Sequence, residues 1–380
     1  MLMAGYVIRI ICSGTLLIAL VTGCTPARPS PEAINAPATA PRPSALSDEE
    51  LASKLDTFMR GQEENLSFSG AALVMREGKV LLSKGYGYYD RQHKLPNTDQ
   101  TPFRIASITK QFTAVAILML QAQGRLDVQD RVCVHLPDCP PVWQTITLHQ
   151  LLTHTSGIVE YKDLPDYPTL WATPAAPAEL MRRFEAQPLA VEPGEKWSYS
   201  NSGYVVLGSI IERLSGMTYE AFVKENIVAP LGMTGTGLSE IPPDLALGYE
   251  NSFTLTPAEM ADPSIEYAAG GLYSTVSDLY RLDQALFTDH LLPQDLRDKM
   301  FTAYEAMPDS GGLSYGYGCQ VGNMNGHRVV GHSGILEGYS TMNVYYPDDR
   351  VAVILLGNQR NPSVYGIGIQ LAYMVLKPAD

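Results

Sequence analysis

The amino-acid sequence predicts a mixed α/β (α+β) fold, in which helices flank one antiparallel β-sheet and an all-helical subdomain is inserted into it. The first observation is that two β-rich runs occur near the start of the folded region and four near its end. The second is that the stretch between them, about 112–265, has the pattern of helices and proline-rich loops. Both ends of the chain are therefore expected to contribute strands to one sheet.

The first elements are expected to be a helix and a hairpin. A capping-box pattern at 47–50, followed by apolar residues at helical spacing, predicts a helix over about 48–62. Two β-rich runs, 69–75 and 80–86, flank a turn at 76–79 and predict the hairpin.

The later elements follow from the same signals. Residues 107–123 are apolar on nearly every side and precede Gly124, which predicts a buried helix. A second helix is expected over 202–214, and a last one over about 364–376. Alternating runs predict strands at 316–322, 327–331, 339–346 and 351–356.

The first 23 residues are typical of an export signal. Arg9 precedes an apolar run of 12 residues, 10–21, which is shorter than the roughly 20 residues that a spanning helix needs. Val21-Thr-Gly-Cys24 resembles a bacterial lipobox, which implies that Cys24 carries a lipid and is the first residue of the mature protein. An ordinary secretory signal with an incidental cysteine is the alternative.

The next segment, 24–46, is interpreted as a tether because six prolines occur between residues 25 and 46. At about 3.1 Å per residue it would reach up to about 70 Å. The folded domain is expected over 47–376. We therefore expect a lipid-anchored protein of the bacterial cell envelope that faces the periplasm and contacts the membrane only through its lipid. Thr25 after the lipidated cysteine favours the outer membrane, by resemblance to Gram-negative lipoproteins.

The charge balance argues against a nucleic-acid partner. The chain has 27 Lys and Arg against 40 Asp and Glu, a formal charge of -13. No basic cluster is long enough to follow a phosphate backbone.

Three cysteines belong to the expected domain. In an oxidising compartment, Cys133 and Cys139 could close a small disulfide loop around Pro137. Two free thiols are the alternative, and Cys319 has no assigned partner.

The motif that carries the strongest chemical signal is Ser107-Ile-Thr-Lys110. The spacing places both side chains on one helix face, and an amine buried at the start of an apolar helix is biased toward the neutral form that can activate a hydroxyl. A surface capping serine with a solvated lysine is the usual cause of this pattern. The apolar surroundings of Lys110 favour the catalytic interpretation.

Two further motifs could complete such a site. Tyr199-Ser-Asn201 precedes the helix expected at 202–214, where a phenol and an amide can face a cleft. The similar string at 249–251 lacks this context and is taken as a loop. Gly331-His-Ser-Gly334 lies at the expected end of a strand, where an exposed N–H could complete an oxyanion hole. A strand-end turn with a structural histidine is the alternative for that string.

Taken together, these motifs resemble the penicillin-recognising serine hydrolases, in the branch of class C β-lactamases, D,D-carboxypeptidases, D-amino-acid peptidases and esterases. The resemblance covers about 50–376 and includes the strings 151–157, 269–275 and 331–338. It implies a β-lactamase/transpeptidase-like fold with the site between sheet and helical subdomain. It also implies no metal and no other cofactor.

The resemblance assigns a role to each motif residue. Ser107 would be acylated, while Lys110 and Tyr199 would share the duties of general base and acid. The expected substrate-binding residues are Asn201, His332, Ser333, Gly334 and Ile335, with the backbone N–H groups of Ser107 and Ile335 forming the oxyanion hole.

One departure from the family pattern bears on the substrate. Class C β-lactamases have Lys-Thr-Gly where this chain has His332-Ser333-Gly334. A lysine is a permanent cation for an antibiotic's carboxylate, whereas a histidine is expected to be only partly charged near neutral pH. We therefore expect hydrolysis of small esters or D-amino-acid peptides, with peptidoglycan among the candidate substrates, rather than efficient β-lactamase activity. His154 is interpreted as structural.

The sequence leaves three alternatives to this function. A class C-like β-lactamase would share the same motifs, and so would a catalytically idle wall-binding lipoprotein of the same fold. The third is an α/β-hydrolase elbow at Gly312-Leu-Ser-Tyr-Gly316. The sequence around Ser314 does not favour it, because a loop precedes the motif and a strand is expected after it.

Overall fold

The computed structural model describes residues 46–171, 173–250, 255–361 and 363–376. The predicted export signal, Cys24 and all of the predicted tether except Leu46 lie outside the described residues. Within the described ranges, no helix is both long and apolar enough to cross a membrane.

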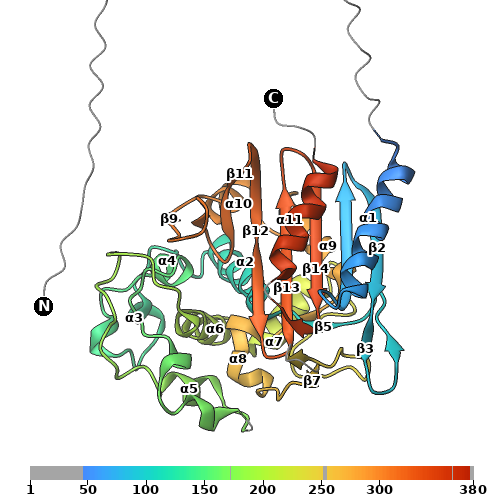
Figure 1. The fold of residues 1–380 in the computed structure, drawn as a ribbon. Helices are drawn as coiled ribbons and strands as arrows, with labels where there is room; N and C mark the ends of the chain where they lie inside the picture. Colours follow the sequence, from blue (N-terminus) through green and yellow to red (C-terminus); the bar gives the residue numbers. More distant parts are fainter. Residues whose placement is uncertain (1–45, 172, 251–254, 362, 377–380) are drawn as a thin grey trace, which may run out of the picture. The chain divides into compact units, whose positions relative to one another are not determined.

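The centre of the fold is an antiparallel sheet whose strands come from both ends of the chain (Figure 1). In the described residues it has eight strands in the order β2-β1-β14-β13-β12-β11-β10-β9, so the first hairpin pairs with the last long strand. The predicted fold class is thereby confirmed. The strand bounds are β1 Gly70–Arg76, β2 Lys79–Tyr86, β9 Glu305–Ala306, β10 Ser314–Tyr315, β11 Gln320–Met324, β12 His327–Leu336, β13 Tyr339–Tyr346 and β14 Val351–Gly357.

Each face of this sheet packs against its own group of helices, because alternate residues of a strand point to opposite sides. In β1, Ala72 and Val74 face α1 (Asp48–Glu64) and α11 (Ser363–Val375), which lie together in front of the sheet in Figure 1. Ala71 and Leu73 face the larger core, which contains α2 (Thr109–Ala122). The sheet therefore has two buried faces, and the site lies on the side of α2.

The helical region between β5 and the last strands follows the prediction, with short strands added. α2 is buried on nearly every side, as the apolar sequence predicted, and α6 (Asn201–Ser215) packs against it. The remaining bounds are β3 Tyr88–Asp90, β4 Leu95–Pro96, β5 Phe103–Arg104, α3 Val132–His135, α4 Leu148–Leu152, α5 Pro177–Met181, α7 Tyr219–Val223, β6 Tyr249–Glu250, β7 Thr256–Pro257, α8 Pro263–Gly270, β8 Tyr273–Ser274, α9 Val276–Leu286, α10 Gln294–Met300 and β15 Gln359–Arg360; short 3-10 helices cover Ala106–Ile108, Pro141–Trp143, Tyr161–Asp163 and Tyr167–Leu170, and a π-helix covers Lys224–Val228.

Two strand predictions near the C-terminal end were wrong. The strand expected at 316–322 is interrupted by a turn, in which the Gly316 N–H donates to the Cys319 carbonyl at 2.8 Å. The turn packs on α2 so closely that a Cβ on Gly318 would lie 2.4 Å from the Lys110 carbonyl oxygen. The strand expected to end at Gly331 continues to Leu336 as β12, so the His332-Ser-Gly motif lies within a strand rather than at its end.

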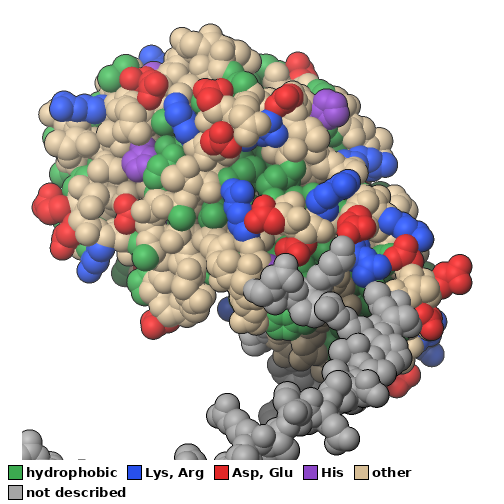
Figure 2. Space-filling model, turned by 90° about the horizontal axis from the view of Figure 1, so that it is seen from above, with side chains coloured by type: hydrophobic (Ala, Val, Ile, Leu, Met, Phe, Trp, Pro, Cys, Tyr) green, Lys and Arg blue, Asp and Glu red, His purple; other side chains and the backbone are tan. Residues whose placement is uncertain are grey.

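The described cysteines and the surface add two observations. Cys133 and Cys139 form a disulfide, and Cys319 is a buried free thiol. On the face shown in Figure 2, acidic and basic side chains are interspersed, and no continuous basic stripe crosses it.

A buried polar cluster joins α2 to the sheet. The Asn343 amide in β13 donates to Oδ1 of Asp283 in α9 at 2.9 Å and lies 3.4 Å from Gln111 in α2. Burial raises the pKa of Asp283 to about 7. Asp283 Oδ2 and Asn343 Oδ1 are both buried without a hydrogen-bond partner. Protonation would turn the unpartnered carboxyl oxygen of Asp283 into a donor, and burial favours the neutral acid.

This cluster predicts a pH-dependent stability. The folded-state pKa of Asp283 lies above the unfolded value of about 3.9, so its contribution is fully present below pH 4 and is lost as the pH rises toward 7. The loss could reach about 4 kcal/mol. Asp283→Asn keeps the shape and cannot ionise, so chemical unfolding at pH 4 to 8 should show the variant gaining stability relative to wild type as pH rises. A constant difference across that range would contradict the neutral acid.

Candidate active site

Ser107 lies in the 3-10 turn Ala106–Ile108 that precedes α2. Ala106 has a positive φ of 50°, a conformation that side-chain-bearing residues seldom adopt. The Ser107 side chain is half-buried and lines a cleft of about 420 Å³ between the sheet and the helical region.

Gly334 allows β12 to approach this turn. A Cβ on Gly334 would lie 2.6 Å from the Ile105 carbonyl oxygen and 2.7 Å from the Ala106 Cβ. The Thr341 hydroxyl in β13 donates to the same Ile105 carbonyl at 3.0 Å. The glycine of the His-Ser-Gly motif thus has a packing role, because it fixes the edge of the sheet against the turn that carries Ser107.

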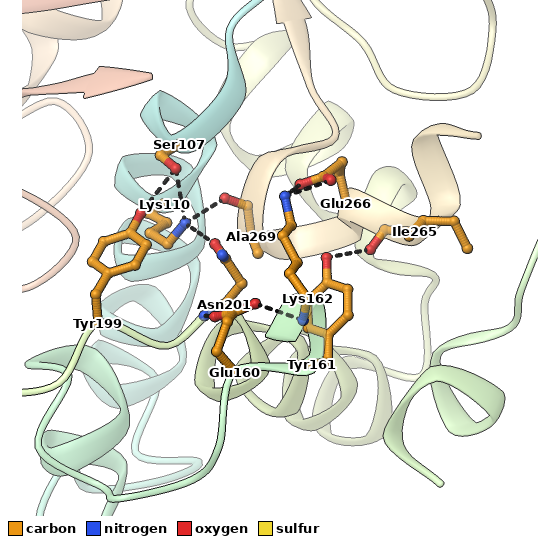
Figure 3. A network of polar contacts seen from close by, with 10 residues as sticks. All are labelled: Ser107, Lys110, Glu160, Tyr161, Lys162, Tyr199, Asn201, Ile265, Glu266 and Ala269. Atoms are coloured by element: carbon orange, nitrogen blue, oxygen red, sulfur yellow. Dashed lines mark hydrogen bonds and ion pairs between the residues drawn. The ribbon is translucent and has the colours of Figure 1, made fainter. Parts of the chain in front are cut away.

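Lys110 lies within hydrogen-bond distance of Ser107, as the helical spacing predicted (Figure 3). Its Nζ is 3.1 Å from Ser107 Oγ, 2.7 Å from Asn201 Oδ1 and 2.7 Å from the Ala269 carbonyl oxygen. These three acceptors come from the turn, from the start of α6 and from α8. The lysine side chain is fully buried.

Burial, together with the nearby charge of Lys162, lowers the pKa of Lys110 to about 7. The charges of Glu160 and Glu266 oppose this shift. The position of Lys110 near the N-terminus of α2 also disfavours a cation. A substantial fraction of neutral amine at neutral pH follows, and a neutral amine can accept a proton from a hydroxyl.

Tyr199 lies on the loop before α6 and donates its hydroxyl hydrogen bond to Ser107 Oγ at 2.8 Å. Burial raises the pKa of Tyr199, so the phenol holds its proton. His154 supports this loop: its Nδ1 accepts the Ser200 N–H at 3.1 Å and its ring lies 4.2 Å from that of Tyr199. Burial holds the pKa of His154 well below its usual range, which agrees with a structural histidine.

Asn201 is the first residue of α6, and its side chain contacts Lys110. Its backbone N–H donates to the carboxylate of Glu160, which also accepts the backbone N–H of Lys162 at 3.1 Å. Burial raises the pKa of Glu160. Glu160 therefore holds the asparagine and the neighbouring turn in place.

A charged pair beside the site was not found from the sequence. Lys162 Nζ lies 2.7 Å from Glu266 Oε2, and both residues line the cleft (Figure 3). The two residues are 104 positions apart, so no spacing rule could join them. The Ala269 carbonyl that receives Lys110 was also missed, although it lies in the 269–275 string that carried the family resemblance.

The expectation that His332 is partly charged near neutral pH was wrong. Its side chain is buried, and burial together with the nearby Lys110 lowers the pKa to about 3. Both ring nitrogens have partners: Nδ1 lies 2.6 Å from the Ser333 carbonyl oxygen and Nε2 lies 2.8 Å from the Tyr315 hydroxyl. A carbonyl can only accept, so Nδ1 carries the proton and Nε2 accepts from the tyrosine. His332 lines the cleft as a neutral group.

The other predicted substrate-binding residues lie along the same wall. β11 pairs with β12 only as far as Gly331, so the edge from His332 onward is not covered by that neighbour. Ser333 and Ile335 line the cleft, and the Ile335 side chain is exposed. An extended ligand could lie along this open edge.

The competing serine motif does not form a nucleophile elbow. Ser314 lies in β10, which pairs with β9 and β11, and no helix follows it directly. In the string at 249–251, the asparagine lies outside the described residues. Among the described side chains, no group of His, Cys, Asp and Glu could hold a metal ion.

Comparisons with known proteins agree with this geometry. The family model described as Beta-lactamase matches residues 55–371. The chain belongs to the β-lactamase family. It is therefore a member of the penicillin-recognising serine hydrolase superfamily, with the fold of β-lactamases and penicillin-binding proteins.

Individual relatives support the family assignment. PbpX of Bacillus subtilis (strain 168), named for penicillin binding, is 37% identical over 80% of this chain and 74% of its own length. The solved structure of an octameric penicillin-binding protein homologue from Pyrococcus abyssi superposes with a TM-score of 0.77. It is 32% identical and covers 85% of this chain and 77% of its own. A D-stereospecific amidohydrolase from Streptomyces has a TM-score of 0.72 and 25% identity over 83% of this chain and 97% of that one.

The charges around Lys110 predict the pH dependence of this family member. The neutral amine is the reactive form, so kcat/KM for ester hydrolysis should fall as the pH drops below about 7. Lys162→Met removes a charge that lowers the pKa of Lys110 and should move this limb to higher pH. Glu266→Gln removes a charge that raises the same pKa and should move the limb to lower pH.

The two variants serve as controls for each other, because both break the Lys162–Glu266 pair. Shifts in the same direction, or unchanged profiles in both, would contradict the electrostatic account.

Proposed function

We propose that this protein hydrolyses small esters or D-amino-acid peptides through an acyl-enzyme on Ser107. The observation that carries the proposal is that Ser107 Oγ contacts both Lys110 Nζ, at 3.1 Å, and the Tyr199 hydroxyl, at 2.8 Å. A hydroxyl between a neutral amine and a protonated phenol has a base to take its proton and an acid to protonate a leaving group.

The proposed acylation begins when neutral Lys110 takes the proton of the Ser107 hydroxyl. Ser107 Oγ then bonds to the substrate carbonyl carbon, and the carbonyl electron pair moves to its oxygen. When the tetrahedral intermediate collapses, the bond to the leaving group breaks and Tyr199 gives its proton to the departing oxygen or nitrogen. A proton then passes from Lys110 to Tyr199, which restores the neutral amine and the phenol. In deacylation a water molecule takes the place of the leaving group. It attacks the acyl carbon, and the proton transfers run in the opposite direction, which releases the acid and the Ser107 hydroxyl.

The oxyanion is proposed to be bound by the backbone N–H groups of Ser107 and Ile335, two residues that line the same cleft. Asn201 is proposed to orient the substrate from a fixed position, because its Oδ1 receives Lys110 and its side-chain amide is hydrogen-bonded to Glu160. Ser333 offers a hydroxyl on the leaving-group side. The exposed side chain of Ile335 leaves its backbone available to a ligand.

The state of His332 supports esters, and peptides without a carboxylate on the leaving group, over β-lactams. Antibiotic-hydrolysing relatives are expected to hold a lysine at this position, whereas His332 is neutral and already bonded to Tyr315. The leaving-group end of the cleft therefore lacks a fixed cation for a carboxylate. Similarity to a D-stereospecific amidohydrolase supports the same choice. β-Lactams are proposed to act mainly as slow acylating inhibitors.

The neutral His332 also changes the expected pH response. A partly charged histidine would weaken acylation by carboxylate-bearing ligands as it titrates near pH 6.5, but its pKa of about 3 removes that effect from the neutral range. Any change of rate near pH 7 is attributed to Lys110 instead.

The nucleophile and the substrate class can be tested together. A fluorophosphonate probe should label the peptide that contains Ser107, Ser107→Ala should abolish labelling, and the matched control Ser314→Ala should retain it. In a panel of an acyl nitrophenyl ester, a D-alanyl-D-alanine peptide and a chromogenic cephalosporin, the first two should be turned over faster. Label on Ser314, or cephalosporin turnover exceeding both other rates, would defeat the proposal.

We further propose that the protein is anchored in the cell envelope through a lipid on Cys24 and faces the periplasm. The support is the sequence pattern at 21–24 and the composition of 25–46. Cys24→Ala should move the protein from the membrane fraction to the soluble fraction after cell lysis and ultracentrifugation. Retention of the variant in the membrane fraction would refute the anchor.

A further inference from the structure

The cleft extends beyond the catalytic residues along β12. It is lined by Ser333, Ile335 and Glu337 in succession and by Arg360 at the far end. Glu337 is the first residue of the turn after β12 and lies four positions from Ser333, which corresponds to about 13 Å of extended chain. The open edge therefore has room for several residues of a bound peptide.

Arg360 is held at this end by the small sheet of β15, β6 and β7. Its strand β15 pairs in parallel with β6, where Arg360 lies opposite Glu250. The Glu250 carboxylate accepts the N–H of Gly338, directly after Glu337, at 3.0 Å. Arg360 is thus placed beside the turn between β12 and β13, far along the strand from His332.

The cations of the cleft differ in their partners. Lys162 pairs with Glu266 at 2.7 Å. His332 is neutral, and Lys110 is buried among its three acceptors. Arg360 is exposed and, among the described residues, has no ion pair or hydrogen bond from its side chain. Among the described residues that line the cleft, Arg360 is therefore a permanently charged group that forms no ion pair with an acid.

We propose that Arg360 determines substrate specificity by binding a carboxylate on the acyl side of the substrate, two to four residues from the scissile bond. The inference rests on the proposed function, which places the leaving group at the His332 end of the cleft and therefore the acyl side at the Arg360 end. A guanidinium can hold a carboxylate through two parallel hydrogen bonds, which an exposed lysine cannot do as well. The preferred substrate is thus an extended peptide with an acidic residue at that distance.

Glu337 provides the internal comparison. It lines the same end of the cleft, is half-buried, and carries the opposite charge. A carboxylate bound at Arg360 would be repelled by Glu337, so removing that charge should strengthen binding of an acidic peptide. A ligand held by Glu337 instead would be a cation and would give the reverse pattern.

The test uses the purified full chain and three pairs of peptides that end in D-alanyl-D-alanine. Each pair carries Asp or Asn two, three or four residues to the acyl side of the scissile bond, with alanine elsewhere. Each peptide is measured as an inhibitor of nitrophenyl ester hydrolysis. At one position the Asp peptide should inhibit about three- to tenfold more strongly than its Asn partner, and the ratio should decrease with added salt.

The variants separate this inference from the proposed function. Arg360→Gln should reduce the ratio to about one, and Glu337→Gln should maintain or increase it; the ratio is taken within each variant, so it does not depend on that variant's own rate of ester hydrolysis. Equal inhibition by Asp and Asn peptides at every position, inhibition by none of them, or a preference that survives in Arg360→Gln would overturn the role of Arg360. Absence of ester hydrolysis or of Ser107 labelling in the wild type would instead reject the proposed function.

Discussion

The buried amine of Lys110 is the constraint on which the rest of the site depends. An amine removed from water needs hydrogen-bond partners, and here they come from three parts of the chain: Ser107, Asn201 and the Ala269 carbonyl. The last requires an irregular α8, in which Tyr267 has a φ of 39° and interrupts the helix. The turn that carries Ser107, α6 and α8 must therefore meet at one atom, and that meeting point fixes the cleft.

The same amine explains the charge state of its surroundings. His154 and His332 are both buried, and in each case proximity to Lys110 adds to burial in lowering the pKa. Several basic groups in one small volume cannot all hold protons, so the histidines remain neutral. The remaining charges that act on Lys110 are Lys162, which lowers its pKa, and the acids Glu160 and Glu266, which raise it.

Sequence patterns predicted the parts of the site that depend on short-range spacing. Ser107 and Lys110 lie one helical turn apart, and Tyr199 directly precedes a helix. These local signals were enough to select the three residues as catalytic candidates. The Lys162–Glu266 pair depends on tertiary packing and has no local signal. The error at His332 has the same origin, because its neutral state follows from burial and from the nearby Lys110, and neither can be read from the local sequence.

The distribution of charge in the cleft separates the chemistry from the choice of substrate. The groups around Ser107 belong to motifs shared with the family, and they can act on many carbonyl compounds. The two ends of the cleft differ in ways that the motifs do not encode: His332 is buried near Lys110 and bonded to Tyr315 of β10, and Arg360 is placed by β15. A carboxylate near the leaving group therefore meets no fixed cation at His332, whereas one on the acyl side can reach Arg360. We therefore infer that substrate specificity depends on the short strands β10 and β15, which lie outside the motifs that resemble the family.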